Sequence, residues 1–166
     1  MGYKSFIGID VGLTGALSVI SNNGKKVEIY DMPVTKVKVG KTYRKKYDER
    51  EMASLMSLLS GDTVCCAIES QHSMPKQGVS SVFSLGYGYG ILIGSLEYSD
   101  MYYTIVTPQK WKKYFGLKSD KSDSIKMALE LYPDADIYLK KHHNRAESLL
   151  IAHWLKEENF RLPEKK

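Results

Sequence analysis

FIGIDVGLTGA, at residues 6–16, is the stretch of sequence that decides the predicted fold. Mostly apolar residues precede Asp10, a pattern typical of a buried strand that ends in a carboxylate. The glycines and the threonine at residues 12–15 favour a tight turn, and residues 16–21 then form a second strand. The stretch therefore predicts two strands joined by a turn, with a carboxylate at the end of the first.

The elements after this unit predict an α/β fold. Residues 21–24, Ser-Asn-Asn-Gly, signal a hairpin turn into a third strand, and the lysine-rich segment after Met32 is expected to be a loop. Opening hairpins followed by strand–helix alternation predict a mixed five-stranded sheet flanked by helices on both faces, within one domain that spans residues 1–166. The remaining strands are predicted at 63–69 and 102–106, and the helices at 48–59, 79–98, 108–114, 121–131 and from about 144 onward.

The composition is that of a folded domain, because 43% of the residues are hydrophobic and 11% are aromatic. The longest mostly apolar stretch, Val82–Leu96, is shorter than the ~20 residues that a membrane span needs. The N-terminus enters a strand without a cleavable apolar segment. We therefore expect a cytoplasmic protein with no membrane contact. Cys65 and Cys66 are neighbours in an apolar run, which predicts two small buried residues and no disulfide framework.

The net charge of +5 is distributed unevenly along the chain. Six bases and no acid lie between Met32 and Tyr47, and a second basic group surrounds Trp111. Such blocks are typical of proteins that bind a polyanion such as nucleic acid, and a solvated lysine loop explains the first block equally well. The six bases of the first block are Lys36, Lys38, Lys41, Arg44, Lys45 and Lys46.

Three acids stand where a purely structural role is hardest to defend. Asp10 and Glu69 each end a buried strand, and Glu147 lies near the start of the last helix. Neighbouring strands would bring the first two to one sheet edge, ~4.8 Å apart. Three bare carboxylates repel one another, and a divalent cation relieves that repulsion, so the cluster predicts a site for two Mg²⁺ or Mn²⁺ ions that clamp a phosphodiester.

Each acid also has a structural explanation that the sequence leaves open. Asp10 would serve as an Asx-turn residue before the glycine-rich turn. Glu69 would be an ordinary acid at a strand end. Glu147 would form a capping box with Asn144 as the N-cap. The metal hypothesis differs in explaining all three positions together.

The motifs resemble those of the RuvC-like Holliday junction resolvases, over nearly the whole chain. Residues 6–16 resemble the first strand and hairpin of that family, Ala67-Ile68-Glu69 resembles its second catalytic strand, and residues 145–152 resemble the final helix of its small phage-type members. The resemblance implies an RNase H-like fold and a homodimeric, metal-dependent hydrolase of DNA recombination and repair. It implies paired nicks in four-way junctions, inside a bacterial or phage-infected cell.

The resemblance also implies roles for individual residues. Asp10, Glu69 and Glu147 match the metal-binding acids of the family, although the last acid is Asp in many relatives. A fourth metal-site residue precedes it by three or four positions, which makes His143 and Asn144 the candidates, and we favour His143. Lys112 and Lys121 resemble basic residues that face the scissile strand and would make DNA binding salt-dependent.

Two further segments acquire roles from the resemblance. The loop after Glu69 lies where the family contacts the junction core, and the long helix carries Gly86, Gly90 and Gly94 at four-residue spacing. That smooth stripe would pack against the chain's own sheet or against a second copy of the chain. The candidate DNA contacts in the loop are Gln71, His72, Lys76 and Gln77.

Three other functions remain open at the level of sequence. A sugar-kinase or actin-like ATPase shares the Asp10–Gly15 pattern, but those proteins need a second phosphate loop and generally well over 300 residues. A nuclease of the same fold acting on flaps, forks or RNA–DNA hybrids would use the same acids. A module that only binds DNA would follow if the metal chemistry had decayed. Cleavage assays distinguish the last two from a resolvase.

Overall fold

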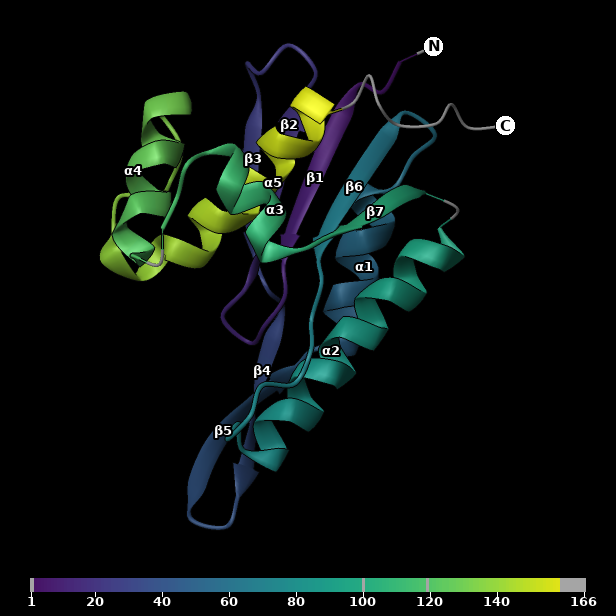
Figure 1. The fold of residues 1–166 in the computed structure, drawn as a ribbon. Helices are drawn as coiled ribbons and strands as arrows, with labels where there is room; N and C mark the ends of the chain where they lie inside the picture. The colour runs from purple at the N-terminus through teal and green to yellow at the C-terminus, as the bar shows by residue number, and fades with distance from the viewer. Residues whose placement is uncertain (1, 100, 119, 159–166) are drawn as a thin grey trace.

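The computed structural model describes residues 2–99, 101–118 and 120–158. The elements follow the predicted order, with one additional strand pair between the third strand and the first helix (Figure 1). In chain order they are β1 (Ser5–Asp10), β2 (Ala16–Ser21), β3 (Val27–Asp31), β4 (Val34–Val39), β5 (Thr42–Tyr47), α1 (Glu49–Leu59), β6 (Val64–Glu69), α2 (Val79–Tyr98), β7 (Tyr102–Val106), α3 (Pro108–Tyr114), α4 (Lys121–Leu131), the 3-10 turn η1 (Lys140–His142) and α5 (His143–Glu158).

The central sheet is mixed and five-stranded, as the sequence predicts, in the order β3-β2-β1-β6-β7. The tight turn after Asp10 makes β2 antiparallel to β1, whereas β6 lies parallel to β1 on its other side, and β7 lies parallel to β6. β1 therefore occupies the centre of the sheet. Because β1 and β6 run in the same direction, their carboxyl ends emerge at one edge.

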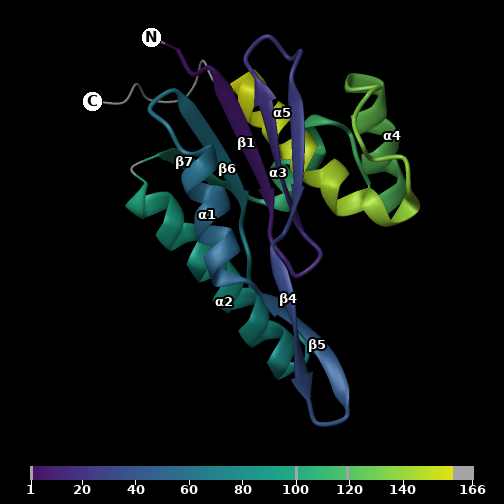
Figure 2. The ribbon, with the colours of Figure 1, turned by 180° about the vertical axis from the view of Figure 1, so that it is seen from behind.

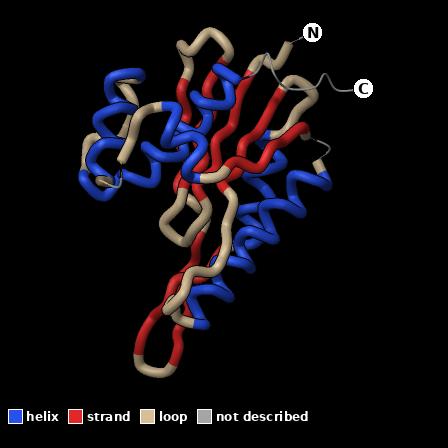
Figure 3. The backbone as a smooth tube through the Cα atoms, in the orientation of Figure 1, coloured by secondary structure: helices blue, strands red, loops and turns tan. Residues whose placement is uncertain are grey.

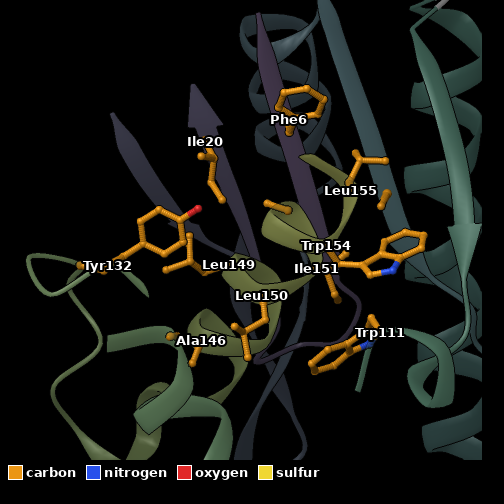
Figure 4. Packing of buried hydrophobic residues seen from close by; sticks show 14 of the residues in the cluster. Phe6, Ile20, Trp111, Tyr132, Ala146, Leu149, Leu150, Ile151, Trp154 and Leu155 are labelled. Atoms are coloured by element: carbon orange, nitrogen blue, oxygen red, sulfur yellow. The ribbon is translucent and has the colours of Figure 1, made fainter. Parts of the chain in front are cut away.

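Helices cover both faces of this sheet (Figures 1 and 2). Alternate residues of a strand point to opposite faces, so Ile7 and Cys66 join the core beneath α1 and α2, while Phe6 and Cys65 join the core beneath α5. Figure 4 shows Phe6 in this second core with the apolar residues of α5. Both cysteines are fully buried and unbridged, which confirms the prediction made for them.

α5 approaches β1 closely because Gly8 has no side chain. A Cβ on Gly8 would overlap the backbone of Ser148 and Ala152 in α5. Beside this contact, the hydroxyls of Ser18 and Ser148 are 2.6 Å apart and form a buried hydrogen bond between β2 and α5. These contacts fix the distance between α5 and the sheet. They thereby fix the position of Glu147, on α5, relative to the ends of the strands.

The lysine-rich segment after Met32 is not the loop that the sequence analysis predicts. It forms the antiparallel pair β4–β5, which extends away from the central sheet (Figures 1 and 3). Most of its residues are exposed, so no apolar face marks the two strands in the sequence. The sequence feature that does indicate a hairpin is Gly40, which lies between the strands and adopts a φ of 60°, as a tight turn requires.

α2 is the least covered of the apolar helices. It is 20 residues long, and over its most apolar 18 residues the mean hydropathy is 1.3 and 17% of the residues are buried. By length and composition it is therefore long enough to cross a membrane, contrary to the expectation based on the shorter stretch 82–96. The inner side of α2 nevertheless belongs to the core, because Leu92 and Leu96 pack beneath the sheet.

Candidate active site

The carboxyl ends of β1 and β6 place two acids at one edge of the sheet. The last paired residues of these parallel strands are Ile9 and Ile68, and Asp10 and Glu69 follow directly. Both are nearly buried, with 7% and 9% of their surface exposed. Ionisable groups are seldom buried to this extent unless they are paired or functional, so the edge is the first candidate for chemistry.

Glu69 is held by hydrogen bonds from two directions. The indole Nε1 of Trp111 donates to one carboxylate oxygen at 2.9 Å, and the amide of Gln71 donates to the other at 3.4 Å. Trp111 is fully buried, so the stronger of these bonds is shielded from water. Glu69 therefore has a fixed orientation on the face of the sheet that α5 covers.

The pKa of Glu69 is raised above its ordinary value, and burial is the main cause. The nearby Glu147 carboxylate raises this pKa further, while the Trp111 hydrogen bond and the Lys112 ammonium lower it. Glu69 and Glu147 therefore interact electrostatically, as the predicted acid cluster requires. A carboxylate with a raised pKa gains from any cation that binds beside it.

Glu147 is connected to α3 and α4 as well as to Glu69. Its Oε1 atom lies 3.0 Å from the ammonium nitrogen of Lys112 and accepts a hydrogen bond of 3.3 Å from the hydroxyl of Ser124. The Lys112 side chain is 31% exposed and that of Glu147 is 14% exposed, so the ion pair is partly shielded. Glu147 thus makes contacts across the site rather than the capping-box contact that the sequence left open.

Helix α3 delivers two neighbouring side chains to the two acids. Thr107 caps the helix by accepting from the Lys110 amide, and Pro108 at the first turn suits this start. From there, Trp111 reaches Glu69 and Lys112 reaches Glu147. The sequence analysis singles out Lys112 but gives Trp111 no role. Its position directly before Lys112 is the only signal in the sequence that points to it.

The two candidates for the fourth metal-site residue lie at the start of α5. The side-chain amide of Asn144 donates to the backbone oxygen of Thr14 at 2.6 Å and to its hydroxyl at 3.0 Å. Asn144 therefore ties α5 to the turn after Asp10. His143 faces a hollow that it shares with Asp120 and Ser122 of the α4 start. The assignment of the fourth position to His143 stays a prediction.

The next residue, Arg145, has a structural role. Its guanidinium forms a two-pronged ion pair with Asp31 of β3, at 2.6 and 2.7 Å, and contacts Asp136 at 2.8 Å. The hydrogen bond from Arg145 holds the pKa of Asp31 below its ordinary value. Together with Asn144, Arg145 anchors the first turns of α5 to the sheet edge at which Asp10 lies.

The candidate ligands are of the type that binds a divalent cation, but their side chains do not converge on one point. Asp10, Glu69 and Glu147 supply carboxylate oxygens, the ligands that Mg²⁺ and Mn²⁺ prefer. Within the described ranges, however, no group of three or more His, Cys, Asp or Glu side chains is close enough to hold a metal ion. Glu147 is neutralised by Lys112 instead. The predicted metal site remains a prediction.

The other predicted contacts are spread over the same end of the molecule. Lys121 opens α4, and its side chain lies outside the described part of the structure. Gln71 contacts Glu69, whereas His72 and Lys76 are exposed in the loop beyond it and Gln77 accepts a hydrogen bond from the Met74 amide. The six bases of β4–β5 and its turn are exposed and do not join the acids.

Known proteins resemble this chain in three-dimensional structure, whereas comparisons of sequence find no match. No protein-family model and no curated protein matches the chain. Thermus thermophilus RuvC matches with a TM-score of 0.60 at 16% identity, over 95% of each chain. The same protein in complex with Holliday junction substrate matches with a TM-score of 0.62 at 14% identity, over 96% of this chain and 95% of that one. The yeast mitochondrial Holliday junction resolvase Ydc2 matches with a TM-score of 0.54 at 16% identity, over 94% and 80%.

These matches define the architecture. The chain is an α/β protein with the RNase H-like arrangement of a mixed sheet between helices. More particularly, it has the RuvC-like fold of the Holliday junction resolvases, as the resemblance in the motifs predicts. The likeness covers nearly the whole length of this chain and of both RuvC chains.

Proposed function

We propose that this protein is a metal-dependent endonuclease that resolves four-way DNA junctions. One observation carries the proposal: two nearly buried carboxylates end adjacent central strands of a RuvC-like fold, and a third acid on α5 interacts with one of them. The matched proteins are a RuvC bound to Holliday junction substrate and a mitochondrial Holliday junction resolvase, which supports branched DNA as the substrate.

Asp10, Glu69 and Glu147 would hold the divalent ions, with His143 as the candidate fourth ligand. When bound, two such ions would supply an activated water and would stabilise the leaving 3′ oxygen of the phosphodiester. Trp111 keeps the Glu69 carboxylate oriented toward the site through its hydrogen bond. Lys112 balances the charge of Glu147. Its ammonium would contact a phosphate of the DNA once that acid binds metal.

The protein would act as a homodimer, because paired nicks across a four-way junction require two active sites. The outer side of α2 supports this assembly. Phe83 is 75% exposed and stacks on Tyr87, and a Cβ added to Gly86, Gly90 or Gly94 would meet no atom within 4 Å among the described residues outside the helix backbone. A second copy of α2 would cover this apolar and smooth surface.

The test is cleavage of a labelled synthetic four-way junction with Mg²⁺ or Mn²⁺, beside linear duplex, flap, fork and RNA–DNA hybrid substrates. We expect paired nicks at the junction, none with Asp10→Asn, and wild-type cleavage by Asp62→Asn. Asp62 is an exposed acid in the turn before β6, so it controls for the loss of one carboxylate. Preferential cleavage of another substrate would keep the nuclease and change its target, and turnover by Asp10→Asn would refute the metal site.

A further inference from the structure

The β4–β5 hairpin projects beyond the sheet edge that carries the acids. Ala16 of β2 pairs with Asp10 on one side and with Asp31, the last residue of β3, on the other. β3 therefore ends at the edge where Asp10 lies, and β4 begins three residues later. Six residues of strand extend roughly 20 Å, so the hairpin forms an arm beyond the candidate active site (Figure 1).

The register of the hairpin sorts its bases onto two faces. Lys36 lies directly opposite Lys45, and Lys38 lies opposite Tyr43. Residues directly opposite in an antiparallel pair, and residues two apart in one strand, share a face. We call the set Lys36, Lys38, Tyr43 and Lys45 the lysine face. Arg44 and Lys46 belong to the opposite face, together with Val37.

The hairpin has no acid of its own to compensate the lysine face, and Asp31, which lines a hollow with Lys45, is paired with Arg145. The sequence has no acid between Met32 and Tyr47, whereas Lys46 on the opposite face has Glu49 at 3.5 Å. Like charges directly opposite each other destabilise a strand pair, so the Lys36–Lys45 arrangement weakens the free hairpin. An anion that binds across the face removes this repulsion. The arrangement is therefore suited to a polyanionic partner rather than to stability.

The base of the arm is anchored to the body of the protein. Tyr47, the last residue of β5, is 1% exposed and its ring packs where Gly88 of α2 leaves room for it. Close to it, the Tyr87 hydroxyl donates to Glu49 at 2.8 Å, and Glu49 is the partner of Lys46. Burial, and then the Asp10 carboxylate, raise the pKa of Tyr47 to about 12.

We propose that the lysine face binds the phosphate backbone of a duplex arm of the DNA substrate and does so without reading its bases. The choice of DNA rests on the proposed function. Lysine ammonium groups act as point charges on phosphates, and this face lacks the planar side chains of Arg, Asn and Gln, whose paired polar atoms match base edges. The anchored arm would hold the duplex at a fixed angle to the acids at the sheet edge.

The test compares two triple variants with the same change in net charge. Lys36→Gln/Lys38→Gln/Lys45→Gln removes the charges of the lysine face, and Lys4→Gln/Lys25→Gln/Lys26→Gln removes three exposed lysines at the opposite end of the sheet. Binding to a four-way junction and to a linear duplex is measured without divalent metal, over a range of salt concentrations. No step of this assay depends on cleavage.

We expect the lysine-face variant to bind both DNAs about tenfold or more weakly at low salt, and to lower the slope of log affinity against log salt by about 2 to 3. The reduction should be the same for unrelated DNA sequences. Thermal stability without DNA should be unchanged or higher, because the Lys36–Lys45 repulsion is gone. The control triple should change neither the salt slope nor the junction affinity by a comparable amount.

Three results would overturn the inference: equal losses in the two triples, a loss confined to one DNA sequence, or lysine-face binding to vesicles with anionic lipid in place of DNA. Failure of the proposed function has a different signature. A wild-type protein that binds DNA through the lysine face but cuts no substrate would refute the nuclease and leave the arm in place. Loss of junction cleavage at low but not at saturating DNA, in the lysine-face variant, would support both.

Discussion

Glu69 is a buried carboxylate of the candidate active site, and its ionisation lowers the stability of the fold. Its pKa is raised mainly by burial, so the folded protein binds this proton more tightly than the unfolded chain does. The sign follows from linkage: the free energy of unfolding decreases as the pH rises from the ordinary pKa through the raised one. At neutral pH the ionised Glu69 therefore destabilises the fold, and a bound cation would offset that loss.

Glu69→Gln should therefore stabilise the protein at neutral pH while it abolishes cleavage. Glutamine retains an oxygen that accepts the Trp111 bond and carries no charge to desolvate. We expect a gain of about 0.5–2 kcal/mol at pH 8 that shrinks toward pH 4, measured by chemical unfolding without metal. Glu130→Gln, at an exposed position of α4, is the control and should show no such pH dependence. A uniform loss of stability at every pH would contradict the cause assigned to the shift.

Trp111 offers a second test at the scale of one hydrogen bond. Its indole N–H lowers the pKa of Glu69, so Trp111→Phe should raise that pKa and move the acid limb of the cleavage profile to higher pH. Trp154→Phe is a matched control, because Trp154 is also buried on the α5 side but has its ring beneath Lys110. Both variants should lose about 1–3 kcal/mol of stability. An identical pH profile in the two would leave Trp111 with a packing role only.

The acids were predictable from the sequence, and their surroundings were not. Asp10 and Glu69 each follow an apolar run, and such a run has a definite end at which a carboxylate is conspicuous. The contacts of Trp111 and Ser124 join α3 and α4 to residues more than 20 positions away. No local pattern encodes such pairs, because they depend on the packing of whole helices.

Among the elements, α2 depends on one glycine more than on the others. A Cβ on Gly88 would overlap the ring of Tyr47, whereas a Cβ on Gly90, two residues further on and on the exposed side, would meet no atom within 4 Å in the described structure. Gly88→Ala should therefore cost about 1–3 kcal/mol and loosen the base of the hairpin. Gly90→Ala should stabilise the helix by about 0.5–1 kcal/mol.

Thermal unfolding of the two variants checks that Gly88→Ala lowers the stability of the protein and that Gly90→Ala raises it. The protein concentration is kept low enough for the protein to be monomeric. Limited proteolysis within residues 34–47 reports separately on the hairpin, and Gly88→Ala should accelerate cleavage there. Equal stability of the two variants would mean that Tyr47 moves aside without cost, and the hairpin would then have a weaker anchor than its burial indicates.

The β4–β5 pair shows why one element was missed. Strands are recognised by a buried face with a period of two, and here both faces carry lysine or lie exposed. Lysines do alternate with valines through residues 36–39, but the charge of the segment outweighs that signal and favours a loop. The five strands of the central sheet had no such conflict, and their places along the chain and the mixture of antiparallel and parallel pairs agree with the prediction.

At the scale of the whole molecule, this chain shares its fold with proteins whose sequences differ from it at most positions. The chain shares 14–16% identity with the RuvC and Ydc2 chains and superposes with TM-scores of 0.54–0.62. What the fold requires is a pattern rather than particular residues: apolar strands, turns after β1 and β2, and room at Gly8 for α5. Many sequences meet these requirements, so the function has to be tested at the acids and at the surfaces.

The oligomeric state is a property of the whole molecule that can be tested directly. We expect the wild-type protein to have twice the 18.8 kDa mass of the chain in light scattering. Phe83→Glu would place a charge in the centre of the proposed α2 interface and should weaken association by about 100-fold. Tyr138→Glu, at a 64% exposed aromatic residue before η1, should leave the dimer intact.

A monomeric Phe83→Glu variant should still nick junctions, because Asp10, Glu69 and Glu147 belong to one chain, but the two nicks should become independent events. A cruciform plasmid separates these outcomes, since coupled nicks give linear product directly and independent nicks give open circles first. A variant that remains dimeric would place the interface elsewhere. Partition of the wild-type protein into neutral lipid vesicles, abolished by Phe83→Glu, would instead assign the apolar side of α2 to a membrane, as its length and hydropathy permit.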